Sequence, residues 1–293
     1  MISHFVTTVK FGQYLYLVKP RFSTSTPQVV TPAPVLQPRT SLSYTSPSVR
    51  PTQPTQPIQP VRPTVMPPPG FTLGDLSPFY GKVRIGYVTT FSYLGSGNRI
   101  NLVSDYSLDT NLDITGWRFR NNKGQEVTIP QAVNLFPPHL VSSLGDIILG
   151  RSTNVYFFNS SSHGPSLHLN KCTGYLNGIY RYDPVLPKNC PYIDRSSISH
   201  LSGQCQNFIL SLGSCETPDL NKFYSSVRSD DTACRSYIDN FSYRGCYARY
   251  SGDSNFISNE WRIWLDGQLP LDPSHDRVEL LDRNGLLVSL YSY

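Results

Sequence analysis

The chain has 293 residues with 25 basic and 20 acidic side chains, a formal charge of +5, and a hydrophobic fraction of 39%. The positive excess does not favour a nucleic-acid partner, because residues 1–74 hold six basic and no acidic residues and the remainder holds 19 basic against 20 acidic. No stretch approaches the ~20 apolar residues that a membrane-spanning helix needs. Membrane attachment would therefore come only through a missing or cryptic N-terminal anchor.

The first 74 residues divide into a possible targeting segment and a linker. In residues 1–19 the apolar run after Lys10 is too short for an export signal, so we interpret this stretch as a degenerate or mis-set targeting segment. Residues 20–69 hold 14 of the 25 prolines and no cysteine or acidic residue, so residues 20–74 are predicted to be a proline-rich linker. Proline removes the backbone donor and fixes φ, which favours extended polyproline II or plain disorder. The proline spacing also fits a ligand for proline-reading domains.

Residues 75–293 carry the pattern of a β-sheet protein. Alternating apolar and polar residues predict two groups of strands, at 82–88, 99–103, 112–120 and 125–129, and near the end of the chain at 276–282 and 286–291. Turns are expected at residues 95–98, at 121–124 and at Asn284-Gly285. Trp261 and Trp264 are expected to point to one face, into the core. Many short strands at regular spacing predict a sandwich or a barrel.

A family resemblance rests on two of these stretches. The sequence LDITGWRFRNNKGQEVTIP, with its Gly116-Trp117 step, and the closing HDRVELLDRNGLLVSLYSY, with its Asp282-Arg283-Asn284-Gly285 turn and Tyr291, resemble the lamin-tail domain in its bacterial, exported form. The resemblance implies an all-β, immunoglobulin-like β-sandwich over residues 75–293 and supplies no common catalytic residues. This chain departs from the family by an insert at residues 172–259.

The insert holds all six cysteines, and none is in a Cys-x-x-Cys pair. This spacing favours disulfides over zinc, and disulfides favour an extracellular or cell-surface location. Helical periodicity predicts one helix within residues 199–215 and a second within 230–246, each with a cysteine near its start and one near its end. Six cysteines allow 15 connectivities. An antiparallel helix pair predicts the bonds Cys215 to Cys234, Cys205 to Cys246 and, by remainder, Cys172 to Cys190.

The residues that could carry chemistry are few. The six histidines are scattered without metal-ligand spacing. The group Asp272-Pro273-Ser274-His275-Asp276 could bind a cation or act as an acid/base pair, but it also fits a turn in which Asp272 and Ser274 bond to their own backbone. We therefore predict no catalytic residue, no metal and no cofactor.

Tyrosine and arginine in the insert suggest a contact surface, because tyrosine offers a large apolar face with a polar tip. The possible ligand contacts are Tyr243, Arg244, Tyr247, Arg249 and Tyr250. The alternative is that these tyrosines only cover the disulfides of a small insert. The predicted function is a non-catalytic, adhesive or structural surface module that binds a protein or a glycan. The alternatives are a secreted hydrolase or its accessory domain, and a surface-layer protein without a specific ligand.

Overall fold

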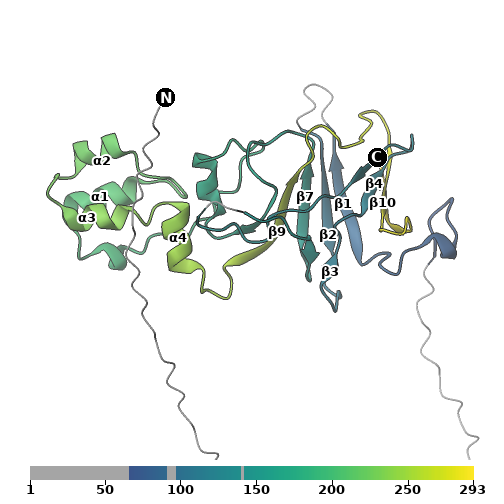
Figure 1. Ribbon diagram of the computed structural model, residues 1–293, viewed down its shortest axis with the longest axis horizontal. Helices are drawn as coiled ribbons and strands as arrows, with labels where there is room; N and C mark the ends of the chain where they lie inside the picture. The colour runs from purple at the N-terminus through teal and green to yellow at the C-terminus, as the bar shows by residue number, and fades with distance from the viewer. Residues whose placement is uncertain (1–65, 91–96, 140–141) are drawn as a thin grey trace, which may run out of the picture. The chain divides into compact units, whose positions relative to one another are not determined.

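The computed structural model describes residues 66–90, 97–139 and 142–293 (Figure 1). The predicted targeting segment, most of the proline-rich linker and the first half of the turn expected at 95–98 lie outside these residues. The described part of the linker contains the short 3-10 helix η1 (Leu73–Asp75), where the Thr72 amide and hydroxyl both donate to Asp75.

The described strands form three sheets. The largest has the order β1-β2-β7-β9-β8, the second has the order β11-β10-β4-β5, and a small pair joins β3 to β6. The strand bounds are β1 Val83–Thr89, β2 Arg99–Ser104, β3 Leu112–Asp113, β4 Arg118–Arg120, β5 Glu126–Thr128, β6 Ile148–Leu149, β7 Asn154–Phe158, β8 Leu167–Asn170, β9 Ile257–Trp264, β10 Arg277–Leu281 and β11 Leu287–Ser292. All described ladders are antiparallel except β7 with β9, which is parallel.

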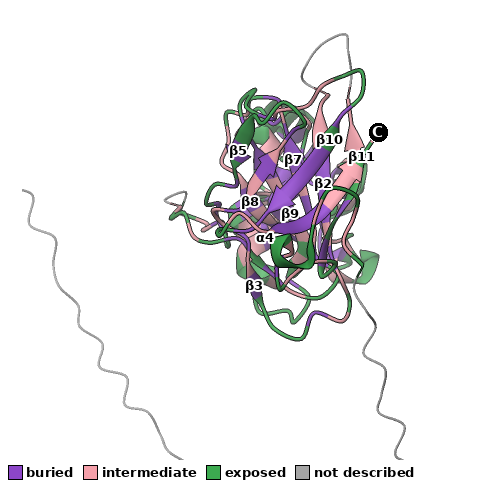
Figure 2. Ribbon diagram, turned by 90° about the vertical axis from the view of Figure 1, so that its right-hand side faces the viewer, coloured by how far each residue is buried: buried purple, intermediate pink, exposed green. Residues whose placement is uncertain are grey.

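The two larger sheets share one apolar core, which we call the sheet core. Alternate residues of both sheets point into it, as the two-residue period of a strand requires. Phe119 of β4 meets Phe157 of β7 there, with ring centres 4.9 Å apart in an edge-to-face arrangement. Figure 2 shows that β10 is largely buried. The arrangement is compatible with a β-sandwich.

The predicted strands are present, with one interruption. The strand expected at 112–120 is divided, because Gly116 has φ +80° and turns the chain between β3 and β4. The sequence did not single out β7 or β8, although β7 lies between β2 and β9 in the larger sheet. The run Asn154–Phe158 is rich in β-branched and aromatic residues, and that is the signal that could have found it.

The larger sheet is covered on both faces over β7, β8 and β9. Trp261 lies in the sheet core, whereas Trp264 belongs to a second apolar cluster. The prediction that both tryptophans point to one face is wrong, because residues three apart in a strand face opposite sides. The second cluster combines Phe158, Leu167 and Trp264 of the sheet with residues from the segment that follows β8.

We call residues 172–256 the cysteine segment. Its end is corrected from the expected 259, because β9 already begins at Ile257. It contains the 3-10 helices η2 (Thr173–Gly178) and η3 (Arg195–Ile198) and the α-helices α1 (Gly203–Ser211), α2 (Leu220–Ser226), α3 (Thr232–Ile238) and α4 (Tyr243–Tyr250). Figure 1 shows the four α-helices gathered beside one another, at the end of the sheets where β9 begins.

Each α-helix begins at a side chain that accepts a backbone N–H. These caps are Ser202, Asp219, Asp231 and Ser242. The helix predicted within 230–246 is two helices, because Ser242 starts a new one after the turn at residues 239–241. The helix α2 was not predicted. Asp219, which caps α2 directly after Pro218, is the signal that could have found it.

The three disulfides are Cys172–Cys246, Cys190–Cys215 and Cys205–Cys234, with Cα–Cα distances of 5.7, 5.3 and 5.7 Å. All three predicted pairs are wrong. The prediction assumed two continuous antiparallel helices, but the turn between α3 and α4 separates Cys234 from Cys246. Cys234 therefore meets α1, and Cys246 joins α4 to the start of the cysteine segment.

Candidate functional site

The cysteine segment carries a shallow groove between η3, α1, α3 and α4. Two depressions of about 100 and 160 Å³ share the wall residues Tyr175, Cys190, Pro191, Tyr192, Ile193 and Phe241. Because they share these residues, we treat them as one groove, the tyrosine groove. Each depression is smaller than the ~300–1,000 Å³ of pockets that enclose small ligands. The shape therefore suits a ligand that lies along the surface.

Tyr192 is the most conspicuous residue of the groove. It is 93% exposed and lines both depressions. A tyrosine ring left this open in water contributes little to folding, since its apolar surface is not buried. The neighbouring Cys190 is held by its disulfide to Cys215, and both cysteines line the groove. The backbone that carries Tyr192 is thus fixed while its side chain remains accessible.

The first depression has a polar rim. Arg249 lies there with its guanidinium carbon 5.6 Å from the ring centre of Tyr250, in cation–π contact. Its Nη1 donates to the Tyr237 hydroxyl at 3.5 Å, which raises the pKa of Arg249. Asp194 lines the same depression; its carboxylate accepts from the Ser196 hydroxyl at 2.6 Å and amide at 3.0 Å, and these bonds lower its pKa.

The second depression is mainly apolar. It is lined by Ile209, Leu210 and Leu212 at the end of α1, and Leu210 is 41% exposed. Tyr175 lines both depressions and is 7% exposed, and burial raises its pKa to about 12. Its hydroxyl therefore stays protonated at physiological pH.

The structure separates the five predicted contact residues. Arg249 and Tyr250 line the tyrosine groove. Arg244 lines a different, wider depression of about 520 Å³ with Asp239, Asn240, Ser242, Gly245 and Ala248. These directions follow from the ~100° that a helix turns per residue, which spreads the residues of α4 around its axis.

The remaining two predicted contact residues, Tyr243 and Tyr247, point toward the interior of the domain. Tyr243 is 3% exposed, and its hydroxyl donates to the Phe136 carbonyl at 2.6 Å while accepting from Asn170 Nδ2 at 3.0 Å. Tyr247 is half-buried and packs between Tyr243 and Phe256, with ring centres 6.1 and 5.3 Å away. We therefore remove Tyr243 from the predicted contact surface, because its role is to join the cysteine segment to the rest of the domain.

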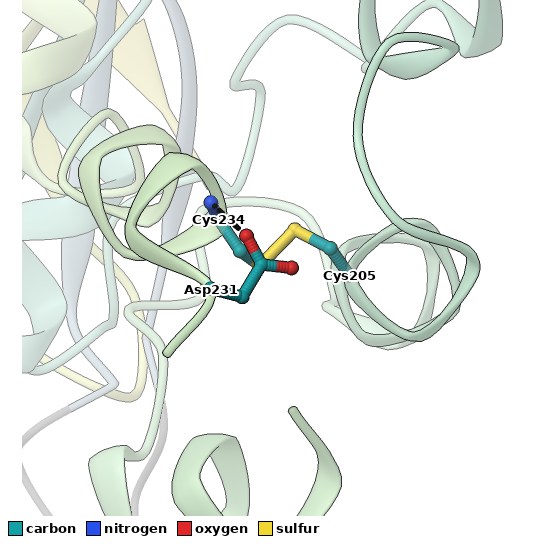
Figure 3. Close-up of side chains that lie close together, drawn as sticks. All are labelled: Cys205, Asp231 and Cys234. Carbon is teal, nitrogen blue, oxygen red and sulfur yellow. Dashed lines mark hydrogen bonds between the residues drawn. A yellow bond between two sulfur atoms is a disulfide. The ribbon is translucent and has the colours of Figure 1, made fainter. Parts of the chain in front are cut away.

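One group of possible metal ligands occurs among the described residues: Cys205, Asp231 and Cys234 (Figure 3). The two sulfur atoms are bonded to each other and have no thiolate to offer a metal. Asp231 accepts from the Cys234 amide at 2.9 Å and from the Ser202 hydroxyl at 2.7 Å. The group thus fastens the start of α3 to the start of α1.

The acidic group near the C-terminus forms a turn, as one of the two interpretations expected. The Ser274 amide donates to Asp272 Oδ1 at 3.0 Å, and Lys123 pairs with Asp272 Oδ2 at 2.6 Å. Asp276 is 4% exposed and accepts from the amides of Asn122, Asp272 and Arg277. These carboxylates hold loops together.

Of the described histidines, His168 has the most distinctive environment. Its ring stacks on Trp261 at 4.2 Å, and Nε2 donates to the Ser258 carbonyl at 2.7 Å. Burial lowers the pKa of His168 to about 4, so the ring is neutral at pH 7. This histidine has a structural role in joining β8 to β9.

Comparison of the chain with protein-family models, with curated proteins and with solved structures finds no match. Among the described residues, no helix combines the length and the apolar character that a membrane crossing requires.

Proposed function

We propose that this chain is a non-catalytic, exported or cell-surface module that binds a protein or glycan ligand through the tyrosine groove. The observation that carries the proposal is Tyr192, an almost fully exposed ring held between two depressions by a disulfide-fixed backbone. Exposed aromatic residues on a rigid support supply contact area at low entropic cost. The predicted contacts Arg249 and Tyr250 belong to the same groove, and Arg244 lies on a neighbouring depression.

The disulfides support an exported location. All six cysteines are paired, and three disulfides indicate a non-cytoplasmic environment. The cysteine segment also carries eight basic and eight acidic residues, so it has no net charge. A neutral surface does not attract a polyanion such as nucleic acid. We therefore propose a ligand that is recognised by aromatic contact and hydrogen bonds.

We further propose that the fold is the immunoglobulin-like sandwich of the lamin-tail domain, with the cysteine segment as a helical insert between β8 and β9. The two motifs behind the resemblance support this, because they touch. Arg283, in the turn at 282–285, donates through Nε to the Thr115 carbonyl at 2.7 Å and pairs with Asp113. Trp117 is 2% exposed in the sheet core.

The test is a binding screen on arrays of extracellular proteins and glycans with the full chain and two variants. The double variant Tyr192→Ala/Arg249→Ala should lose binding by about tenfold or more if the tyrosine groove is the site. Tyr224→Ala is the matched control, because Tyr224 is a 51% exposed tyrosine on α2 that does not line the groove. Equal binding by the double variant and the control would contradict the proposal.

A further inference from the structure

Proline recurs in the linker with a strict period. Between residues 51 and 63 every third residue is proline, in the sequence Pro-Thr-Gln-Pro-Thr-Gln-Pro-Ile-Gln-Pro-Val-Arg-Pro. Polyproline II has three residues per turn, so a peptide of this sequence in that conformation would carry all five rings along one face. The rings would recur about every 9 Å. A three-residue period would therefore line up the rings in one continuous ridge. We call this set of five rings the proline ridge.

The tyrosine groove has the features that receive such a ridge. Polyproline II ligands bind aromatic-lined grooves, in which rings separate neighbouring slots. Here Tyr192 stands between two depressions of about 100 and 160 Å³, with Tyr175 and Phe241 on the walls they share. Both depressions are shallow and mainly aromatic or aliphatic. Their small volumes suit single ring contacts rather than enclosure of a whole ligand.

The polar groups at the rim of the groove can bind the polar atoms of such a peptide. Proline has a carbonyl but no N–H, so the five prolines of this peptide offer only acceptors. Arg249, whose guanidinium is a pure donor, lies exposed at the rim. Asp194 lines the same depression, and each of its carboxylate oxygens accepts one hydrogen bond from Ser196. Its negative charge remains available to Arg62 of the peptide.

We propose that the tyrosine groove binds the proline ridge of residues 51–63 from a second copy of this chain. The inference rests on the proposed function of the groove and names its ligand. The ridge and the groove are different surfaces, so the contact is heterologous, and such contacts extend into open chains or close into rings. The module would then assemble with itself outside the cell, and copies would be joined ridge to groove.

The test measures self-association of the full chain by sedimentation velocity over a concentration series. The unmodified chain and the control Tyr224→Ala should form oligomers that grow with concentration. Tyr192→Ala, which damages the groove, and Pro54→Ala/Pro57→Ala/Pro60→Ala, which breaks the ridge, should each stay monomeric. An excess of a synthetic peptide with the sequence of residues 51–63 should dissociate the oligomers of the unmodified chain.

Mixing the two monomeric variants tests directly whether the ridge of one copy binds the groove of another. Tyr192→Ala retains the ridge and the triple proline variant retains the groove, so a one-to-one mixture should form a heterodimer and stop there. The absence of a heterodimer, or an unmodified chain that is monomeric at every concentration, would overturn the inference. The triple variant leaves the described fold untouched, so misfolding cannot account for its result.

Failure of this inference is distinguishable from failure of the proposed function. If the chain does not self-associate but binds a glycan or another protein on the arrays, and Tyr192→Ala abolishes that binding, the groove is a site with a different ligand. If Tyr192→Ala changes neither array binding nor self-association, both the inference and the proposed function are wrong.

Discussion

The sheets and the cysteine segment are stabilised by different means. In the sheets, strands distant in sequence interlock through backbone ladders and one apolar core that contains Phe119, Phe157 and Trp261. The cysteine segment has four α-helices of seven to nine residues, below the ~12–15 at which isolated helices become even marginal in water. Three disulfides and four capping side chains compensate for their shortness. A cross-linked surface can leave a ring such as Tyr192 in solvent, because its folding does not depend on burying every aromatic residue.

The largest effect should follow from removing the bond that joins the two ends of the cysteine segment. Cys172–Cys246 closes 74 residues, and the loss of that constraint on the unfolded chain corresponds to about 4 kcal/mol. In a Trp264→Phe background, where the remaining Trp117 and Trp261 both lie in the sheet core, the variant Cys172→Ala/Cys246→Ala should lose helical circular dichroism at a lower urea concentration than it loses tryptophan fluorescence. A single coincident transition would show that the two regions are not stabilised independently.

A slightly smaller effect should follow from a cavity in the sheet core. Phe119 is fully buried against Phe157, so Phe119→Ala should cost about 3–4 kcal/mol of unfolding free energy in urea titrations. Phe119→Leu, which keeps most of the volume, should cost clearly less. If alanine and leucine were equivalent, packing of this ring would not be what stabilises the sheets.

His168 should make stability depend on pH. Its folded pKa of about 4 lies below the unfolded value of 6.5, so between these values the unfolded chain binds more protons. Unfolding free energy should therefore be highest above pH 6.5 and fall on the order of 2–3 kcal/mol as the pH drops to about 4. His168→Gln should flatten this part of the curve in urea titrations at several pH values. An unchanged slope would assign the pH dependence to other groups.

Loss of a helix cap should have an effect of about 1 kcal/mol. The Ser242 hydroxyl accepts from the Gly245 amide at 3.1 Å at the start of α4, so Ser242→Ala should lower the unfolding free energy by about that amount. Ser274→Ala, at an exposed position in a loop, is the control. Hydrogen exchange should become faster at the α4 amides than elsewhere in the protein. An equal change in exchange rate across the whole protein would contradict a local role.

The smallest effect on stability is expected in the tyrosine groove itself. Because Tyr192 is 93% exposed, Tyr192→Ala should change the unfolding free energy by less than about 0.5 kcal/mol. The same substitution should nevertheless weaken ligand binding. A large loss of stability in thermal or urea unfolding would mean that Tyr192 supports the fold instead of the ligand.

Local patterns in the sequence were enough to predict most of the strands, the presence of helices between the cysteines, and the turn at residues 272–276. These features depend on signals that neighbouring residues carry: alternation of apolar residues, turn residues and side chains that cap helices. The same signals placed the start of the second helix at residue 230, and Asp231 caps α3. They also showed that tyrosine and arginine gather in the cysteine segment.

The pairing of the cysteines and the accessibility of the tyrosines depend instead on tertiary packing. The turn at residues 239–241 reorients α4, and Gly245 allows that turn because a Cβ there would come within 2.5 Å of the Asp239 carbonyl oxygen and of the Asn240 Cα. This reorientation sends Cys246 to Cys172, turns Tyr243 into the interior and leaves Arg249 in the same depression as Tyr192. Periodicity along the chain does not report the angle between two consecutive helices. The angle between α3 and α4 follows from packing between residues distant in sequence. This angle determines which residues line the tyrosine groove.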